Sequence, residues 1–134
     1  MESKGIVLDS SAFVAFMRRE STADVIGRVI EKSDFVFMSA SSRLESCMVL
    51  NSEASFSESD MLRAQADLGI TIVPFSSDHA VSAFEAFLKF GKGRHKAALN
   101  FGDCQSYATA KLAGLPLLFV GNDFNHTDID IVAV

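Results

Sequence analysis

Four carboxylates stand where a folded chain could bring them to one point. Asp9 directly follows the short apolar run GIVL, and Asp123 comes three residues after the run PLLFV. Asp103 lies in NFGDCQSY, and Glu45 lies in SASSRLESCMVL. Such a cluster would be an oxygen-only ligand set, which suits Mg²⁺ or Mn²⁺. Without a cation the like charges would repel one another and raise at least one pKa, so the cluster favours a divalent-ion site.

Each acid also has a simpler explanation. Asp103 stands three residues after Asn100, a good helix cap, so it could complete a capping box. Ser42 and Glu45 have the same spacing, although Ser39 could cap that helix one turn earlier. Within the helix, Glu45 would have apolar neighbours and would need a partner.

The two acids that follow apolar runs have simple explanations as well. Asp9 could only cap the first helix, and Asp123 could be a turn residue in GNDF. Each of these local roles is a sufficient explanation for a single acid. Four together, with two of them at strand ends, favour a common site.

Apolar β-rich runs alternate with segments of helical periodicity. The expected strands are 5–8, 35–39, 70–75 and 116–120, with a fifth on the edge at 129–134. The expected helices are 10–20, 22–32, 40–51, 57–69, 77–90 and 100–113. This alternation predicts one α/β domain over 1–134, with a mostly parallel sheet of four to five strands flanked by helices on both faces. Ligands of such sheets bind beyond the carboxyl ends of the strands, where Asp9 and Asp123 are expected.

Composition narrows the class of protein. A chain of 134 residues with 49% apolar content can bury a core as one domain. The net charge of −5 argues against a general nucleic-acid coat but does not exclude a nuclease. Cys47 and Cys104 form no recognisable pair, which suits a reducing compartment and a packing role. No signal peptide or membrane-length apolar run is present, so we expect a cytoplasmic protein with no membrane partner.

One basic, glycine-spaced loop stands out, GKGRHK at 91–96. Lys92, Arg94 and Lys96 are the best candidates for a rim that binds RNA phosphates, with His95 beside them. The alternative is an ordinary solvated loop.

The sequence resembles a known family over essentially its whole length. VLDSSAFVAF is similar to the opening of PIN-domain ribonucleases, and SASSRLESCMVL to their helix that carries a glutamate. The stretch FGKGRHKAALNFGDCQSYATAKLAGLPLLFVGNDFNHTDI resembles the C-terminal half of the VapC toxins of bacterial toxin–antitoxin pairs.

This resemblance implies roles for individual residues. It implies that the metal-binding and catalytic acids are Asp9, Glu45, Asp103 and Asp123. Ser10 matches a supporting hydroxyl position, and Asn122 stands where relatives often carry a further acid. The implied activity is Mg²⁺-dependent hydrolysis of RNA phosphodiester bonds by metal-activated water, with Mn²⁺ as an alternative ion. The implied partners are a VapB-like antitoxin, an RNA substrate and a second copy of the chain.

Other functions remain to be weighed. A haloacid-dehalogenase-like phosphatase also has an aspartate after its first strand, but it needs a second one where this chain has Ser11. A receiver domain needs an acid pair that is missing. A PIN-fold binding module that only forms an antitoxin and operator complex is the main alternative.

A surplus of phenylalanine on helical faces predicts a homodimer interface; these residues are Phe13, Phe16, Phe84, Phe87 and Phe90.

Overall fold

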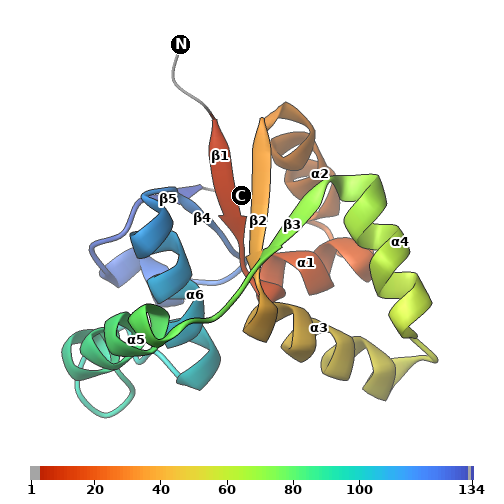
Figure 1. Cartoon of the computed structure of the whole chain (residues 1–134). Coiled ribbons are helices and arrows are strands. Elements are labelled where there is room, and N and C mark those ends of the chain that lie inside the picture. Colours follow the sequence, from red (N-terminus) through yellow and green to blue (C-terminus); the bar gives the residue numbers. More distant parts are fainter. Residues whose placement is uncertain (1–3, 133) are drawn as a thin grey trace.

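A computed structural model describes residues 4–132 and 134. Each of its first three strands is followed by two helices (Figure 1). In chain order they are β1 (Gly5–Leu8), α1 (Ser10–Met17), α2 (Ala23–Lys32), β2 (Phe35–Ser39), α3 (Ala40–Glu53), α4 (Glu58–Leu68), β3 (Ile70–Val73), α5 (Ser77–Phe90), α6 (Phe101–Ala113), β4 (Leu117–Leu118), the 3₁₀ helix η1 (Asp123–His126) and β5 (Ile131–Val132).

The sheet confirms the predicted fold class. Its five strands are ordered β3-β2-β1-β4-β5, and every neighbouring pair is parallel. β1 is central, with Val7 in register with Phe37 on one side and with Leu117 on the other. All carboxyl ends therefore meet at one edge, where Figure 1 shows the helices that follow β1 and β2 beginning.

The alternation of side chains along β1 explains why both faces of the sheet are covered. Ile6 and Leu8 point into a core formed with α1, α2, α3 and α4. Val7 points the other way, into a core formed with α5, α6 and the segment around Phe124. Because each face is buried, the strands are apolar without a polar side.

Helix ends follow the local chemistry of the sequence. Ser57 and Asp60 form a capping box at the start of α4, and Gly69 ends that helix in the left-handed conformation at φ 66°. Gly114 ends α6 in the same way. His79 completes the capping box of α5 with Ser76.

Some strands are shorter than the sequence indicates. β3 ends at Val73 because Pro74 has no N–H to give to the ladder. β4 ends at Leu118 rather than at residue 120, and the N–H of Val120 is donated to the hydroxyl of Ser11. The edge strand expected at 129–134 is confirmed only at 131–132, and residue 133 lies outside the described residues.

The phenylalanine argument for an interface is wrong for part of its set. Phe13 is fully buried in the core, and Phe16, Phe87 and Phe90 are partly buried against it. Only Phe84 is largely exposed, at 61%. In the part of the chain that the structure describes, no helix is long and apolar enough to cross a membrane.

Candidate metal and nuclease site

Asp9 occupies the first position after the central strand and caps α1. Its carboxylate is 5% exposed. Oδ2 accepts two bonds from Ser11, one from the backbone N–H at 3.0 Å and one from the hydroxyl at 2.5 Å. Oδ1 accepts a bond from the hydroxyl of Ser106 on α6. The local capping role is therefore real, and it holds the side chain at the sheet edge.

The orientation of the Ser11 hydroxyl follows from its neighbours. Its oxygen accepts the Val120 N–H at 3.0 Å, so its single proton is free to point at Asp9. Ser11 thus joins the ends of β1 and β4. This explains physically why a hydroxyl residue stands two positions after the aspartate.

Glu45 reaches the same edge from α3. It is exposed rather than buried, and its Oε1 accepts the Ser10 hydroxyl at 2.5 Å. The Ser42 capping box does not form, because Ser39 caps α3 and leaves Glu45 within the helix. Gly102 on α6 makes room for the carboxylate, since a Cβ there would lie 2.9 Å from Oε2 of Glu45.

Asp103 caps its own helix, while its role as a metal ligand stays a prediction. It completes a capping box in which its Oδ2 accepts the Asn100 N–H at 3.0 Å and its own N–H is donated to Asn100 Oδ1 at 2.9 Å. Burial raises the pKa of Asp103 from 3.8 to about 6, against the lowering effect of the Asn100 N–H. The value of about 6 also includes the raising effect of the charges of Asp123, Asp9 and Glu45. The negative charges of all three other acids therefore act on the Asp103 carboxyl.

Asp123 lies in η1, beyond β4, and is exposed. Asn122 precedes it and its Oδ1 accepts a weak bond from Asn125 at 3.3 Å. The supporting role predicted for Asn122 thus stays a prediction, since its recorded side-chain bond is within its own loop.

The four acids surround one edge but are not gathered around one point. Within residues 4–132, no three His, Cys, Asp or Glu side chains are placed so that they could already hold a metal ion together. The carboxylates of Asp9, Glu45 and Asp103 instead accept bonds from hydroxyl and backbone donors. The donor chemistry still fits a hard divalent cation, because the set is all oxygen. Burial is the main cause of the raised pKa of Asp103, and the charges of the other three acids add to it.

The basic loop has its own structural ties. Lys92, Arg94 and Lys96 are exposed, and the Arg94 guanidinium lies 5.1 Å from the centroid of the Phe87 ring. His95 is half-buried, and its Nδ1 accepts the Ala97 N–H at 3.0 Å. RNA binding by this loop stays a prediction.

Sequence reasoning missed Ser106. It stands one helical turn after Asp103 and is 1% exposed. The usable signal was a serine inside an otherwise apolar helical segment, because a buried hydroxyl needs a partner. Cys104, predicted to pack, is buried in the core as expected.

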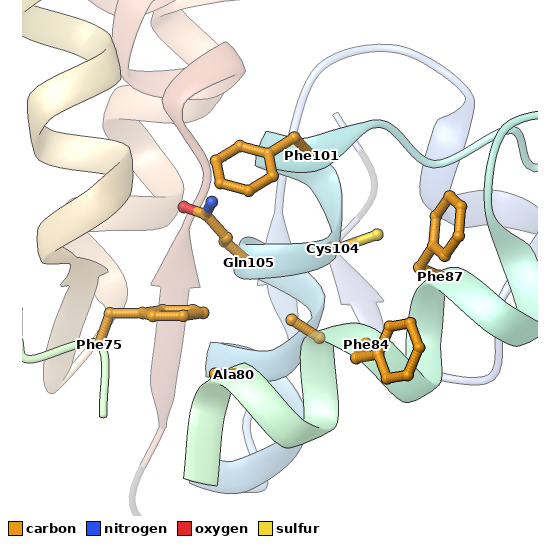
Figure 2. A pocket seen from close by; sticks show the side chains of 8 residues that line it. Phe75, Ala80, Phe84, Phe87, Phe101, Cys104 and Gln105 are labelled. Carbon is orange, nitrogen blue, oxygen red and sulfur yellow. The ribbon is translucent and has the colours of Figure 1, made fainter. Parts of the chain in front are cut away.

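An apolar groove adjoins the acids. Its two hollows have volumes of about 590 and 280 Å³ and share Phe75, Phe101 and Gln105. The smaller hollow lies between Phe84 and Phe87 of α5, Phe101 of α6 and Phe75 (Figure 2). The larger hollow reaches Glu45, so the groove extends from Glu45 to α5. Phe101 is 85% exposed, which is unusual for a ring of that size. We define the apolar groove by the side chains of Leu44, Met48, Phe75, Phe84 and Phe101.

A comparison with known families decides the assignment. The sequence model of the PIN domain matches residues 6–130. The chain belongs to the PIN domain family. The ribonuclease VapC30 of Mycobacterium tuberculosis is 42% identical over 136 residues, covering 96% of this chain and 99% of that protein. The ribonuclease VapC of Mycolicibacterium smegmatis is 38% identical, covering 95% of this chain and 99% of that protein.

Solved structures agree on the PIN fold. VapC20 of Mycobacterium tuberculosis, described as a toxin that cleaves the sarcin–ricin loop, has a TM-score of 0.73 at 17% identity. The match covers 95% of this chain and 98% of that one. A toxin–antitoxin complex from Klebsiella pneumoniae has a TM-score of 0.71 at 16% identity, covering 95% and 96%. At these identities the likeness concerns the fold alone.

The contact at Gly102 predicts that one substitution weakens cation binding without destabilising the fold. Gly102→Ala should displace the Glu45 carboxylate and weaken Mg²⁺ binding, while the fold persists because Ala favours a helix over Gly by up to about 1 kcal/mol. Calorimetric Mg²⁺ titration and thermal unfolding measure the two effects. Gly27→Ala on α2 is the matched control, since a Cβ there would meet only the Phe16 ring. Unchanged Mg²⁺ affinity in Gly102→Ala would contradict this account of the glycine.

The raised pKa of Asp103 predicts a pH effect on the ion-free protein. Because the pKa is higher in the folded than in the unfolded chain, the carboxyl favours folding when protonated. This contribution is complete below pH 3.8 and is lost as pH rises through about 6. Between pH 7 and pH 5 the wild type should therefore gain more stability than Asp103→Asn in EDTA. Equal gains for the two proteins in thermal unfolding would contradict it.

Proposed function

We propose that this chain is a Mg²⁺-dependent endoribonuclease, the toxin of a VapBC-type pair that acts in the cytoplasm. The observation that carries the proposal is Asp9, a buried carboxylate at the end of the central strand with Glu45, Asp103 and Asp123 around it. Relatives that are named VapC ribonucleases, 38–42% identical over nearly the whole chain, support it.

The proposed chemistry needs the acids as ligands. Asp9, Glu45, Asp103 and Asp123 would hold Mg²⁺, with Mn²⁺ as an alternative. When bound, the ion would supply an activated water and would neutralise charge on a phosphate oxygen. The chain itself contributes position: Ser11 and the α1 N-terminus fix Asp9, and Ser10 fixes Glu45. No side chain needs to form a covalent intermediate.

The alternatives are less well supported. A phosphatase of the haloacid-dehalogenase type needs a second acid at position 11, and the hydroxyl of Ser11 is bound between Asp9 and the Val120 N–H. A non-catalytic binding module would have no use for four repelling acids at one edge, because their repulsion lowers stability.

Removal of single carboxylates tests the activity. Asp9→Asn, Glu45→Gln and Asp103→Asn should each reduce Mg²⁺-dependent RNA cleavage by about two orders of magnitude or more, because each loses a ligand charge. Asp128→Asn is the control and should retain activity, since Asp128 pairs with Tyr107 and Lys111, which lie one and two turns beyond Asp103 along α6. A purified, folded Asp103→Asn protein with wild-type rates would refute the site.

We propose that the antitoxin inhibits by covering the apolar groove and the acids together. The groove is continuous with the site, since Glu45 and Gly102 line its larger hollow. A tail with apolar side chains and one Arg would fill both parts, because a guanidinium can bond two carboxylates at once. Relatives of the fold crystallised as toxin–antitoxin complexes support such a partner.

This mode of inhibition predicts competition with Mg²⁺. A synthetic antitoxin tail should inhibit less at high Mg²⁺, and it should bind Asp9→Asn/Asp103→Asn more weakly than wild type. Met48→Glu, which places a charge in the groove at a position now 64% exposed, should weaken the tail but preserve basal cleavage. Inhibition indifferent to both changes would place the antitoxin elsewhere.

We also propose a homodimer. The supporting surface is the face of α5 that carries Val81 and Leu88, which are 61% and 45% exposed. Light scattering at micromolar concentration should give twice the chain mass, and Val81→Glu/Leu88→Glu should give a monomer. A wild-type monomer would contradict the proposal.

A further inference from the structure

Ser106 is a buried polar residue that the proposed chemistry does not yet use. It lies in the middle of α6, it is 1% exposed, and its hydroxyl donates to Oδ1 of Asp9. A second buried hydroxyl, that of Ser42 on α3, lies 3.2 Å from the Ser106 oxygen. Such a chain of hydroxyls ending on a carboxylate has a defined direction.

The direction follows from counting protons. A carboxylate only accepts hydrogen bonds, so the single proton of Ser106 points to Asp9. The proton between the two serines therefore belongs to Ser42. The order is Ser42 to Ser106 to Asp9, and each bond polarises the next in a site shielded from water.

The lone pairs of Asp9 can be counted in the same way. Oδ2 accepts both the N–H and the hydroxyl of Ser11, which uses its two lone pairs. Oδ1 accepts only Ser106, which leaves one lone pair on that atom. The position of the Ser106 hydroxyl decides which direction this remaining lone pair faces.

The two serines also connect the elements that carry the other acids. Ser42 stands one turn before Glu45 on α3, and Ser106 stands one turn after Asp103 on α6. The hydroxyl relay therefore links α3 and α6 to the end of β1, where Asp9 lies. A change in the relay would alter the placement of Asp9 relative to the acids on both helices.

We propose that Ser106 is a positioning residue that directs the one remaining lone pair of Asp9 Oδ1 toward a divalent cation, with Ser42 orienting Ser106. The inference rests on the proposed function, in that the cation is the one the acids would hold. Asp9 would then be a monodentate ligand that binds the cation through Oδ1.

The test uses metal affinity measured directly. Ser106→Ala should bind Mn²⁺ and Mg²⁺ about ten-fold more weakly or worse in calorimetric titration, as the loss of partners of metal ligands typically causes. Ser42→Ala should show the same direction with a smaller change. Cleavage by Ser106→Ala should need more Mg²⁺ but approach the wild-type kcat at saturation, a split that general loss of structure would not produce.

The matched control is Ser46→Ala. Ser46 is as buried as Ser106, and its hydroxyl donates only to the Ser42 carbonyl at 2.8 Å, so its loss should leave metal affinity unchanged. Thermal unfolding in EDTA shows that each variant is folded. Should Ser106→Ala fail to fold, Ser106→Cys retains the shape with a much weaker donor and is expected to bind the ions more weakly than wild type.

The outcomes separate the two proposals. A wild-type protein that binds neither ion would overturn the metal-dependent function itself. Wild-type binding with Ser106→Ala, or Ser106→Cys in its place, within two-fold of that affinity or tighter would overturn only the role of Ser106.

Discussion

The constraint on which this molecule depends is the burial of one carboxylate at the end of its central strand. A charge taken out of water is costly unless it is fully bonded. Asp9 meets this requirement with a backbone N–H, two hydroxyls and the N-terminus of α1. Strand β1 must therefore be followed at once by a helix, and α6 must bring a hydroxyl across the sheet edge. The packing of both helices follows from this one group.

The neighbouring acids add a second constraint that acts against stability. Asp103 stabilises its helix as a capping residue, yet burial and three like charges raise its pKa to about 6. The glycine beside it admits the Glu45 carboxylate rather than favouring the helix. A chain selected only for stability would relieve this repulsion. Its persistence at one edge is what a cation site requires.

The sequence was sufficient to predict the elements and their order, because period and caps are local properties. The strand β2 and helix α5 were predicted to the residue, and the parallel sheet followed from alternation. The ends of β3 and β4 were not, since they depend on Pro74 and on the Val120 N–H being bound by Ser11. Glu45 was placed on the right helix, but its exposure and its Ser10 partner depend on how helices cross. The partner of Ser106, 97 residues away, has no local signature.

The acid edge also connects activity with control. The chain carries a net charge of −5, and RNA is a polyanion, so the acids on their own repel the proposed substrate. A divalent cation at the acids reverses the local sign and makes phosphate binding favourable. An Arg guanidinium at the same place would also offset the negative charge of the acids, but it supplies no activated water. The apolar groove, whose larger hollow is lined in part by Glu45, can hold the apolar part of such an inhibitor. Under the proposed function, one cluster of negative charge would hold the metal needed for catalysis and would also be the attachment point of the antitoxin.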